Sequence, residues 1–303
     1  MKVIKMSVEE AEQDWKKLLD KAITKNAFVD WPWIRTIHMH PDVHKIQICI
    51  VYDDNDEPII GVPIYIPKYK GDYSDILISK GIDSEIVYPL ITEILKKFIK
   101  TAFPYGSHFK YNSAFVIMNR DKVVEDKLKG SWNIILPKSI EEYELSLNKK
   151  VRYNINYREK LARKDHKFEI CSKVDKDHLW MFYMLNKKRW GPRWFRGQLR
   201  NFLDCYIDAL GDKIWVDVLM LDDIPVFTTL GMVCGDIFHS FLSGYDDTYK
   251  KYGPGKLLYY HKIRQTIKLG FSEYDFMKGD SIHKQSLGAQ KRLRFILERS
   301  MYV

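Results

Sequence analysis

The sequence lacks several features that would assign it to a common class of protein at once. Its four cysteines (Cys49, Cys171, Cys205 and Cys234) lie far apart without a Cys-x-x-Cys pair, which favours buried thiols over a disulfide or zinc framework. No Gly-x-Ser-x-Gly elbow or Ser-His-Asp pattern supports covalent acyl-enzyme chemistry. No apolar run suits a membrane span, and the N-terminus shows no signal-peptide pattern. We therefore expect a cytoplasmic protein without a transmembrane segment.

What the sequence does contain is apolar, aromatic and basic residues. Hydrophobic residues make up 46% and aromatic residues 14% of the 303 positions, enough for packed cores in one large or two medium domains. The net charge of +9 is uneven, because residues 1–140 hold 20 basic against 19 acidic residues and residues 141–303 hold 29 against 21. The basic second half favours an acidic partner, such as a phosphate-bearing cofactor, a nucleotide sugar or RNA.

One succession of elements occurs twice in the chain. The segments QICIVYDDNDEPIIGVPIYI and IWVDVLMLDDIPVFTTLGMV both read as a hairpin with an acidic turn and a proline. Each precedes a helix with one apolar stripe, in YPLITEILKKFIK and KLLYYHKIRQTIKLG, and then a short aromatic strand, in HFKYN and YDFMKG. Asp53 to Thr101 and Asp222 to Gly270 both span 48 residues. This equal spacing favours a duplicated α/β architecture over chance similarity.

The two copies differ where the helix begins. The second copy carries YKKYGPGK at residues 249–256, and the first has acidic residues and no pair of glycines. Gly253 and Gly255 allow a close approach of the backbone, the helix start supplies N–H groups, and Lys250, Lys251 and Lys256 add positive charge. The pattern predicts an anion site, against the alternative of a solvated turn.

These residues resemble a known superfamily. A strand, then [Arg/Gln]-x-x-Gly-x-Gly, then a helix is the pyrophosphate-binding loop of GNAT N-acyltransferases, and Lys250-x-x-Gly253-Pro254-Gly255 is similar to it, with Lys at the first position and with Pro254 lacking an N–H. The order LSGYDDTYKKYGPGKLL … GFSEYDFMKGDSIHK resembles tandem-GNAT proteins that include the cellulose-biosynthesis acetyltransferases. The segments LNKKVRYNINYREKLARKDHKFEI and FVDWPWIRTI extend the likeness. Fem-type aminoacyltransferases, which share the duplicated fold and use aminoacyl-tRNA, are a more distant resemblance.

The resemblance implies an α/β fold of tandem GNAT-like domains, with mixed central sheets flanked by helices. We expect a degenerate N-terminal domain at 1–140 and a C-terminal domain at 141–303 that holds the donor site. The implied activity is direct transfer of an acyl group, foremost acetyl, from acyl-CoA to an amine or hydroxyl of a sugar, nucleotide sugar or polysaccharide precursor. The turn would then hold the CoA pyrophosphate. Two alternatives are a Fem-like transferase that uses tRNA and a non-catalytic nucleic-acid- or polysaccharide-binding module.

Two basic segments are candidates for the acceptor site, which we expect between the two halves. The helix predicted at 149–167 has eight Lys or Arg and two acidic residues, with Arg152, Arg158 and Arg163 expected to face outward. The stretch 186–200 has six cations, no acid and two tryptophans. Arg152, Trp190, Arg193 and Trp194 would line a phosphate-bearing acceptor. The alternatives are a solvated linker helix and a loop anchored by tryptophan.

The chemistry would come from the segment after the second helix. His283 has an unperturbed pKa of about 6.5 and can take a proton from the acceptor at neutral pH. Lys284, in the place of the Lys of a Fem-type Phe-Lys pair, would stabilise the oxyanion or hold a donor phosphate. Asp275 or Asp280 would orient either residue, with Tyr245 and Asp246 as the next candidates for the base. The alternative is a structural turn with a surface Lys284–Asp280 pair.

We expect no metal ion. His38, His40 and His44 lie close together in IHMHPDVH, but no carboxylate or cysteine completes a familiar zinc spacing, and Pro41 marks a turn.

Overall fold

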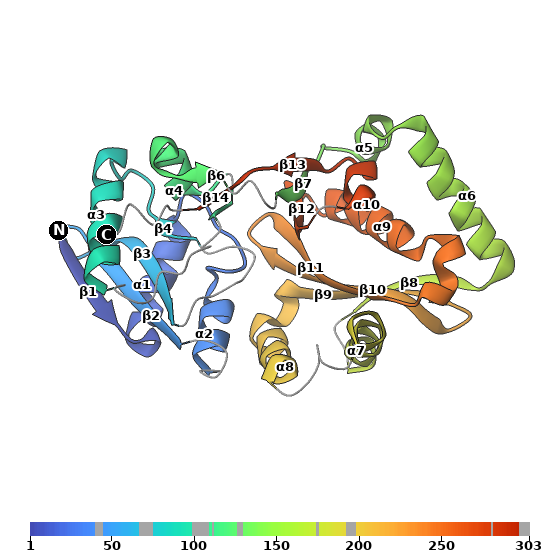
Figure 1. Ribbon diagram of the computed structural model, residues 1–303, viewed down its shortest axis with the longest axis horizontal. Helices are drawn as coiled ribbons and strands as arrows, with labels where there is room; N and C mark the ends of the chain where they lie inside the picture. The colour runs from blue at the N-terminus through green and yellow to red at the C-terminus, as the bar shows by residue number, and fades with distance from the viewer. Residues whose placement is uncertain are drawn as a thin grey trace. The chain divides into compact units, whose positions relative to one another are not determined.

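The computed structural model describes residues 1–39, 45–66, 75–98, 109–110, 112–125, 130–173, 176–191, 198–279 and 281–296 (Figure 1). The chain forms two compact units, one of Met1–Gly130, Asn201–Ala209 and Arg292–Val303, the other of Ser131–Arg200 and Leu210–Lys291. These units differ from the expected division at residue 140 in three segments. Residues 131–140 belong to the second unit, and 201–209 and 292–303 belong to the first.

The first unit is built around a small antiparallel sheet with the order β1-β2-β3-β4, and a second sheet has the order β5-β14-β6. Its elements are β1 (Lys2–Met6), α1 (Val8–Lys21), α2 (Trp31–Met39), β2 (Lys45–Tyr52), β3 (Pro58–Ile66), β4 (Leu77–Ile78), α3 (Ser84–Phe98), β5 (Phe109–Lys110), α4 (Ala114–Met118), the 3₁₀ helix η1 (Arg120–Lys122), β6 (Val124–Glu125), most of α8 (Gln198–Leu210) and β14 (Arg294–Ile296). Polar helix caps and buried aromatic side chains stabilise this first unit. Ser7 and Glu10 form a capping box at α1, and the fully buried Trp15 donates to the Val29 carbonyl at 2.9 Å.

The second unit is built around a mixed sheet with the order β13-β7-β12-β11-β10-β9-β8. Its elements are β7 (Ser131–Ile135), α5 (Ile140–Ser146), α6 (Lys149–Asp165), β8 (Phe168–Lys173), α7 (Lys176–Trp190), the 3₁₀ helix η3 (Gly211–Lys213), β9 (Ile214–Leu221), β10 (Ile224–Cys234), β11 (Ile237–Tyr245), the 3₁₀ helix η4 (Asp247–Tyr252), α9 (Pro254–Lys268), β12 (Glu273–Lys278), α10 (Ile282–Ser286) and β13 (Gln290–Arg292). Strands β11 and β12 run parallel and pair only over 237–239 and 273–275. Beyond that point the described residues of the two strands, which continue to Tyr245 and Lys278, do not pair with each other, so α9 connects two strands that separate.

Helices α7 and α9 cover opposite faces of this sheet (Figure 1). Side chains alternate between the faces of a strand, and the sequence uses both faces. On one face, the Phe227 ring makes an edge contact with Tyr259 of α9. On the opposite face, the backbone of Gly244 lies against Asn186 of α7. A side chain on Gly244 would approach the backbone of Asn186 within 2.5 Å, so only glycine lets α7 pack this closely.

Both units contain the repeated succession of elements. In each, an antiparallel hairpin (β2–β3 or β9–β10) is followed by a third strand and then by a helix, α3 or α9. The α/β class with mixed sheets flanked by helices is therefore confirmed. The copies diverge after the helix, because β12 lies beside β11 in its sheet, whereas β5 pairs with β14 in a separate sheet. Within the described residues, no helix is both long enough and apolar enough to cross a bilayer.

Candidate functional site

The candidate site lies at the turn between η4 and α9 in the second unit. Gly253 adopts the left-handed conformation (φ 62°, ψ 47°) and Pro254 takes the first position of α9. Glycine adopts this conformation at no steric cost, and proline suits a first helical position because its missing N–H has no partner there in any case. The glycine–proline pair therefore turns the chain abruptly from η4 into α9.

Close packing explains both glycines. A Cβ on Gly253 would lie 2.9 Å from the Arg158 side chain, and one on Gly255 would lie 2.7 Å from the Phe227 ring. The first helix turn offers fewer donors than the sequence suggests. Pro254 has none, and the N–H groups of Gly253 and Lys256 donate to the carbonyls of Lys250 and Gly253. Side-chain cations must therefore contribute most of the attraction for an anion.

Arg158 of α6 holds the turn in place. Its Nη1 donates to the Lys251 carbonyl at 2.7 Å and approaches the Lys250 carbonyl at 3.4 Å. The expectation that Arg158 points outward from the basic helix is therefore wrong, since its guanidinium lies against the turn. Ile155 and Ala162, which were expected to face the core, are buried.

The cations Arg158 and Lys256 lie within electrostatic reach of each other and of His283. Burial, followed by the positive charge of Arg158, lowers the pKa of Lys256. Burial also lowers the pKa of His283, and the charges of Lys256 and Arg158 lower it further. Lys251 lies 3.7 Å from Asp165, and its ammonium lies 4.5 Å from the centre of the Tyr252 ring. The turn thus combines Lys250, Lys251, Lys256 and Arg158 beside one histidine that favours its neutral form.

A polar network fixes Tyr252, the residue that precedes the Gly253 turn. The Tyr252 hydroxyl donates to Asp165 at 2.9 Å and lies 2.8 Å from Nε2 of His166. The other ring nitrogen of His166 lies 2.5 Å from Asp222, in the acidic turn between β9 and β10. Tyr252 is buried, so these contacts fix the end of η4 and hence the lysines that precede Gly253.

Lys284 has a structural role in this arrangement. Its ammonium donates to the carbonyls of Phe276, Met277 and Lys278 at 2.8, 3.2 and 2.8 Å. Met277 has a φ of 62°, so β12 ends in a bend whose carbonyls converge on one point. An ammonium has three hydrogens, and these contacts use them. This geometry argues against the expected oxyanion role of Lys284, which instead anchors the segment that carries His283.

Asp275 and Tyr245, also expected to act in catalysis, lie on strands of the second unit. Asp275 is fully buried, accepts from the Met277 N–H at 2.8 Å and lies 3.3 Å from Nδ1 of His239, itself fully buried. Tyr245 at the end of β11 stacks on Phe227, and the Arg189 guanidinium lies 4.9 Å from its ring centre. Asp280 lies outside the described residues. The structure thus brings together His283 and the turn, and it does not bring Asp275 to their surface.

The residues expected at the acceptor site are only partly described. Arg152 donates to the Glu144 carbonyl at 2.7 Å. Arg193, Trp194 and the side chain of Trp190 lie outside the described residues, so their roles stay predictions. His40 and His44 also lie outside them, and His38 contacts Glu9. Among the residues that the structure describes, no group of three or more His, Cys, Asp or Glu side chains could hold a metal ion.

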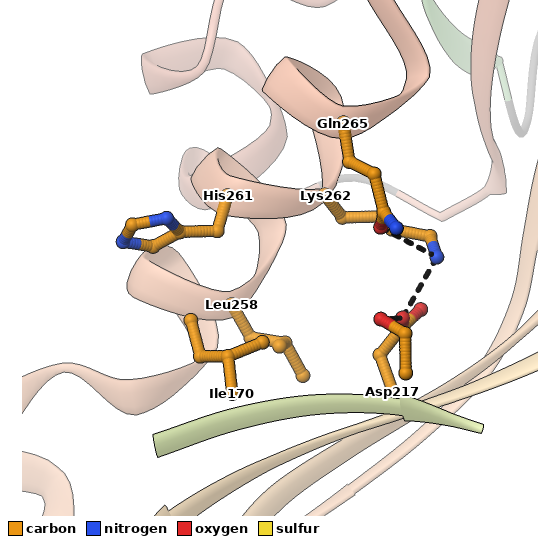
Figure 2. Close-up of a pocket in the computed structure, with 7 residues that line it drawn as sticks. Ile170, Asp217, Leu258, His261, Lys262 and Gln265 are labelled. Atoms are coloured by element: carbon orange, nitrogen blue, oxygen red, sulfur yellow. Dashed lines mark hydrogen bonds and ion pairs between the residues drawn. The ribbon is translucent and has the colours of Figure 1, made fainter. Parts of the chain in front are cut away.

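Sequence reasoning missed two features of the second unit. Arg158 follows the helical pattern of a basic surface, and only the packing of α6 against η4 reveals its contact. A pocket also lies two turns further along α9, against β8 and β9, where Lys262 and Asp217 meet (Figure 2). The run KLLYYHKI showed Lys262 only as one more basic residue on an amphipathic helix.

Comparison with known proteins bears on this geometry. Residues 149–285, which include α6, the turn and all of α10 but Ser286, match a family described as acetyltransferase (GNAT) domain. No curated protein sequence matches the chain. The solved structure of FemX is similar with a TM-score of 0.65 and 11% identity, covering 99% of this chain and 98% of that one.

Two further structures are similar over almost the whole chain. The C-terminal domain of a candidate lysylphosphatidylglycerol synthetase from Agrobacterium fabrum has a TM-score of 0.60 and 12% identity, covering 95% of this chain and 91% of that one. A tandem GNAT protein from the clavulanic acid biosynthesis pathway has a TM-score of 0.51 and 9% identity, with 97% and 96% covered. At these identities the likeness shows the fold, which is that of tandem GNAT-like domains.

Proposed function

We propose that the protein is an acyltransferase that takes an acyl group, foremost acetyl, from acyl-CoA at the Gly253 turn. The observation that carries the proposal is a glycine–proline helix start that Arg158 contacts and that Lys250, Lys251 and Lys256 flank in the sequence, inside the segment that matches the GNAT domain family. Diphosphates bind where a helix start and cationic side chains coincide, because both favour negative charge.

The proposed acceptor is an amine or hydroxyl of a sugar, nucleotide sugar or polysaccharide precursor. Its nitrogen or oxygen would attack the thioester carbonyl, lose its proton to His283, and expel the CoA thiolate without a covalent enzyme intermediate. His283 suits this step because burial and the nearby cations lower its pKa, which keeps the imidazole neutral and able to accept a proton. Lys284 would act by positioning His283. The proposal includes a cytoplasmic location, which the four free thiols support.

A second candidate donor is aminoacyl-tRNA, and the outer face of α6 supports it. Tyr153 and Tyr157 are 67% and 54% exposed, and their rings are nearly parallel with centres 6.4 Å apart. Exposed Lys160 and Lys164 continue the same face at helical spacing. Aromatic rings flanked by cations bind single-stranded nucleic acid by stacking and by phosphate contacts. The structural likeness to FemX agrees with this alternative.

Calorimetry separates these donors. Acetyl-CoA, a longer acyl-CoA and an aminoacylated tRNA are titrated in turn into the full-length protein. We expect one acyl-CoA site per chain, and we expect acyl-CoA binding not to depend on the tRNA. Silence with every acyl-CoA at millimolar concentration, together with binding of the charged tRNA, would establish the second donor. Binding without turnover of any amine or sugar acceptor would instead indicate a non-catalytic binding module.

A further inference from the structure

A pocket of about 210 Å³ lies between α9 and the β8–β9 edge of the second unit. It is lined by Ile170, Ser172, Asp217, Leu258, His261, Lys262 and Gln265. Figure 2 shows the apolar Ile170 and Leu258 on one side and the ammonium of Lys262 between the side chains of Asp217 and Gln265 on the other. The pocket therefore has an apolar wall and a polar wall, the usual composition of a small-molecule site.

The polar wall is a buried ion pair. Lys262 Nζ lies 2.7 Å from Asp217 Oδ1, and each of these side chains is only 1% exposed. The ammonium also lies 3.2 Å from Gln265 Oε1 and 3.8 Å from the centre of the Trp215 ring. The charges of this carboxylate and this ammonium cancel, so the two groups give the pocket no net charge that would attract an ion.

The carboxylate of Asp217 is satisfied on one oxygen only. Its Oδ1 accepts from Ser172 and from Lys262, whereas its Oδ2 has no hydrogen-bond partner among the described residues. A buried acceptor without a partner is costly, and the cost is larger for a charged group. This asymmetry favours an incoming group that donates a hydrogen bond to Oδ2.

The charge balance and the volume restrict the class of ligand. An added cation would lie close to Lys262 and an added anion close to Asp217, and either would be desolvated without a counter-ion. The pocket is smaller than the ~300–1,000 Å³ of sites for drug-sized ligands and equals the liquid volume of about seven water molecules. We propose that this pocket binds a small neutral molecule with several hydroxyl groups, of glycerol to monosaccharide size, whose O–H donates to Asp217 Oδ2.

This pocket is separate from the turn that we propose for the donor. Lys262 follows Gly253 by nine residues, which is about 13 Å along a helix that rises 1.5 Å per residue. The proposal therefore goes beyond the acyl transfer, and either one can fail without the other.

Saturation-transfer NMR on the full-length protein tests the pocket directly. The neutral probes are glycerol and D-glucose, and the charged probes are acetate and methylammonium. We expect transfer to the neutral probes at millimolar concentration and none to the charged ones. The substitution Ile170→Trp fills the apolar wall and should reduce the transfer at least tenfold. Ile224→Trp, at a 46% exposed site on β10 of the same sheet, is the matched control and should leave it unchanged.

A second variant removes the acceptor and keeps the volume. Asp217→Leu with Lys262→Met replaces the ion pair by apolar groups of similar volume, a change that buried pairs often tolerate. Its folding is checked by circular dichroism, and it should bind the neutral probes at least tenfold more weakly. Equal transfer from charged and neutral probes, transfer that survives Ile170→Trp, or no transfer because the pocket holds only water would each overturn the proposal.

Discussion

The two copies of the repeated segment begin their helices in opposite ways. At α3 the Asp83 carboxylate accepts from the Glu85 N–H at 2.9 Å, so a negative side chain already occupies the helix start. At α9 the residue before the helix is Gly253, which provides no side-chain cap. Cations surround that second start, with Arg158 against its turn and Lys256 beside it. An anion would therefore meet a carboxylate at the first start and cations at the second.

Under the proposed function, the duplicated frame would bind a ligand in one copy only. The strands and the helix are built by the same hydrophobic pattern in both copies, and the change lies in one cap and its neighbours. The family match agrees with this comparison, because it covers residues 149–285 and therefore only the second copy. The predictions below aim to break or sharpen this contrast, beginning with the largest expected effect.

The largest effect is expected at His283. His283→Ala should lower kcat by roughly 10²–10⁴, because a positioned general base contributes about that factor. His283 accepts a proton only when neutral, and its pKa is lowered from the ordinary value of 6.5. Activity should therefore persist above the lowered pKa and disappear as the pH falls through it, with the acidic limb below 6.5. The measurement is kcat at saturating substrates across pH.

His38→Ala is the control for this prediction, because His38 is a partly exposed histidine of the first unit. It should leave both kcat and the pH profile unchanged. A His283 variant that keeps more than about half of the wild-type turnover would show that the base lies elsewhere, with Tyr245 next to be tested.

A carboxylate at the second helix start should make it resemble the first. Gly253→Asp places a negative group where the donor phosphates are proposed to lie, and we expect the Kd for acetyl-CoA to rise about 100-fold. One lost charge-assisted hydrogen bond of ~1.5–3 kcal/mol accounts for a factor of this size. The measurement is calorimetric titration with acetyl-CoA.

Gly81→Asp is the matched control for the glycine variant. Gly81 also has a positive φ (84°), precedes α3 and has open space around its Cα. Both variants carry the strain of a non-glycine residue at positive φ, so a loss of affinity in both would point to general destabilisation and would break the comparison.

Removing one cation of the turn should have a smaller effect. Arg158→Ala or Lys256→Ala should each weaken acetyl-CoA binding roughly tenfold, as expected for one charge-assisted contact. Lys80→Ala, at an exposed lysine before α3, should leave the affinity unchanged. If all three variants bind equally well, the cations around Gly253 are only a solvated surface.

The smallest effect is expected at the cap of α3. Asp83→Ala removes a side-chain cap and should lower the free energy of unfolding by about 0.5–2 kcal/mol. The affinity for acetyl-CoA should not change, because the donor phosphates are proposed to lie at the other helix start. Chemical denaturation measures the stability. A change in donor affinity would mean that the first copy takes part in donor binding.

Much of the fold follows from the sequence because its signals are local. The acidic turns with Pro58 and Pro225 mark both hairpins, and the apolar stripes mark α3 and α9, since turn chemistry and helical periodicity act over a few residues. The Gly253 turn was predictable for the same reason. A left-handed glycine followed by a first-turn proline is a local signal for that change of direction.

The rest of the site depends on contacts between distant segments. Arg158 sits on a helix face that reads as solvated, and its contact arises because α6 packs beside η4, about 90 residues later in the chain. Lys284 reads as a free cation next to His283. Its ammonium instead donates to three carbonyls, because Met277, a residue that gives no turn signal, adopts a positive φ. No local pattern encodes either arrangement.

A crystal structure of the protein soaked with CoA tests the central claim most directly. The account predicts diphosphate density beside Gly253, within contact distance of Arg158 and Lys256, and none beside Asp83 at the start of α3. Diphosphate density at any other place in the second unit, or at the α3 start, would contradict the claim that the open, cationic helix start is what distinguishes the second copy.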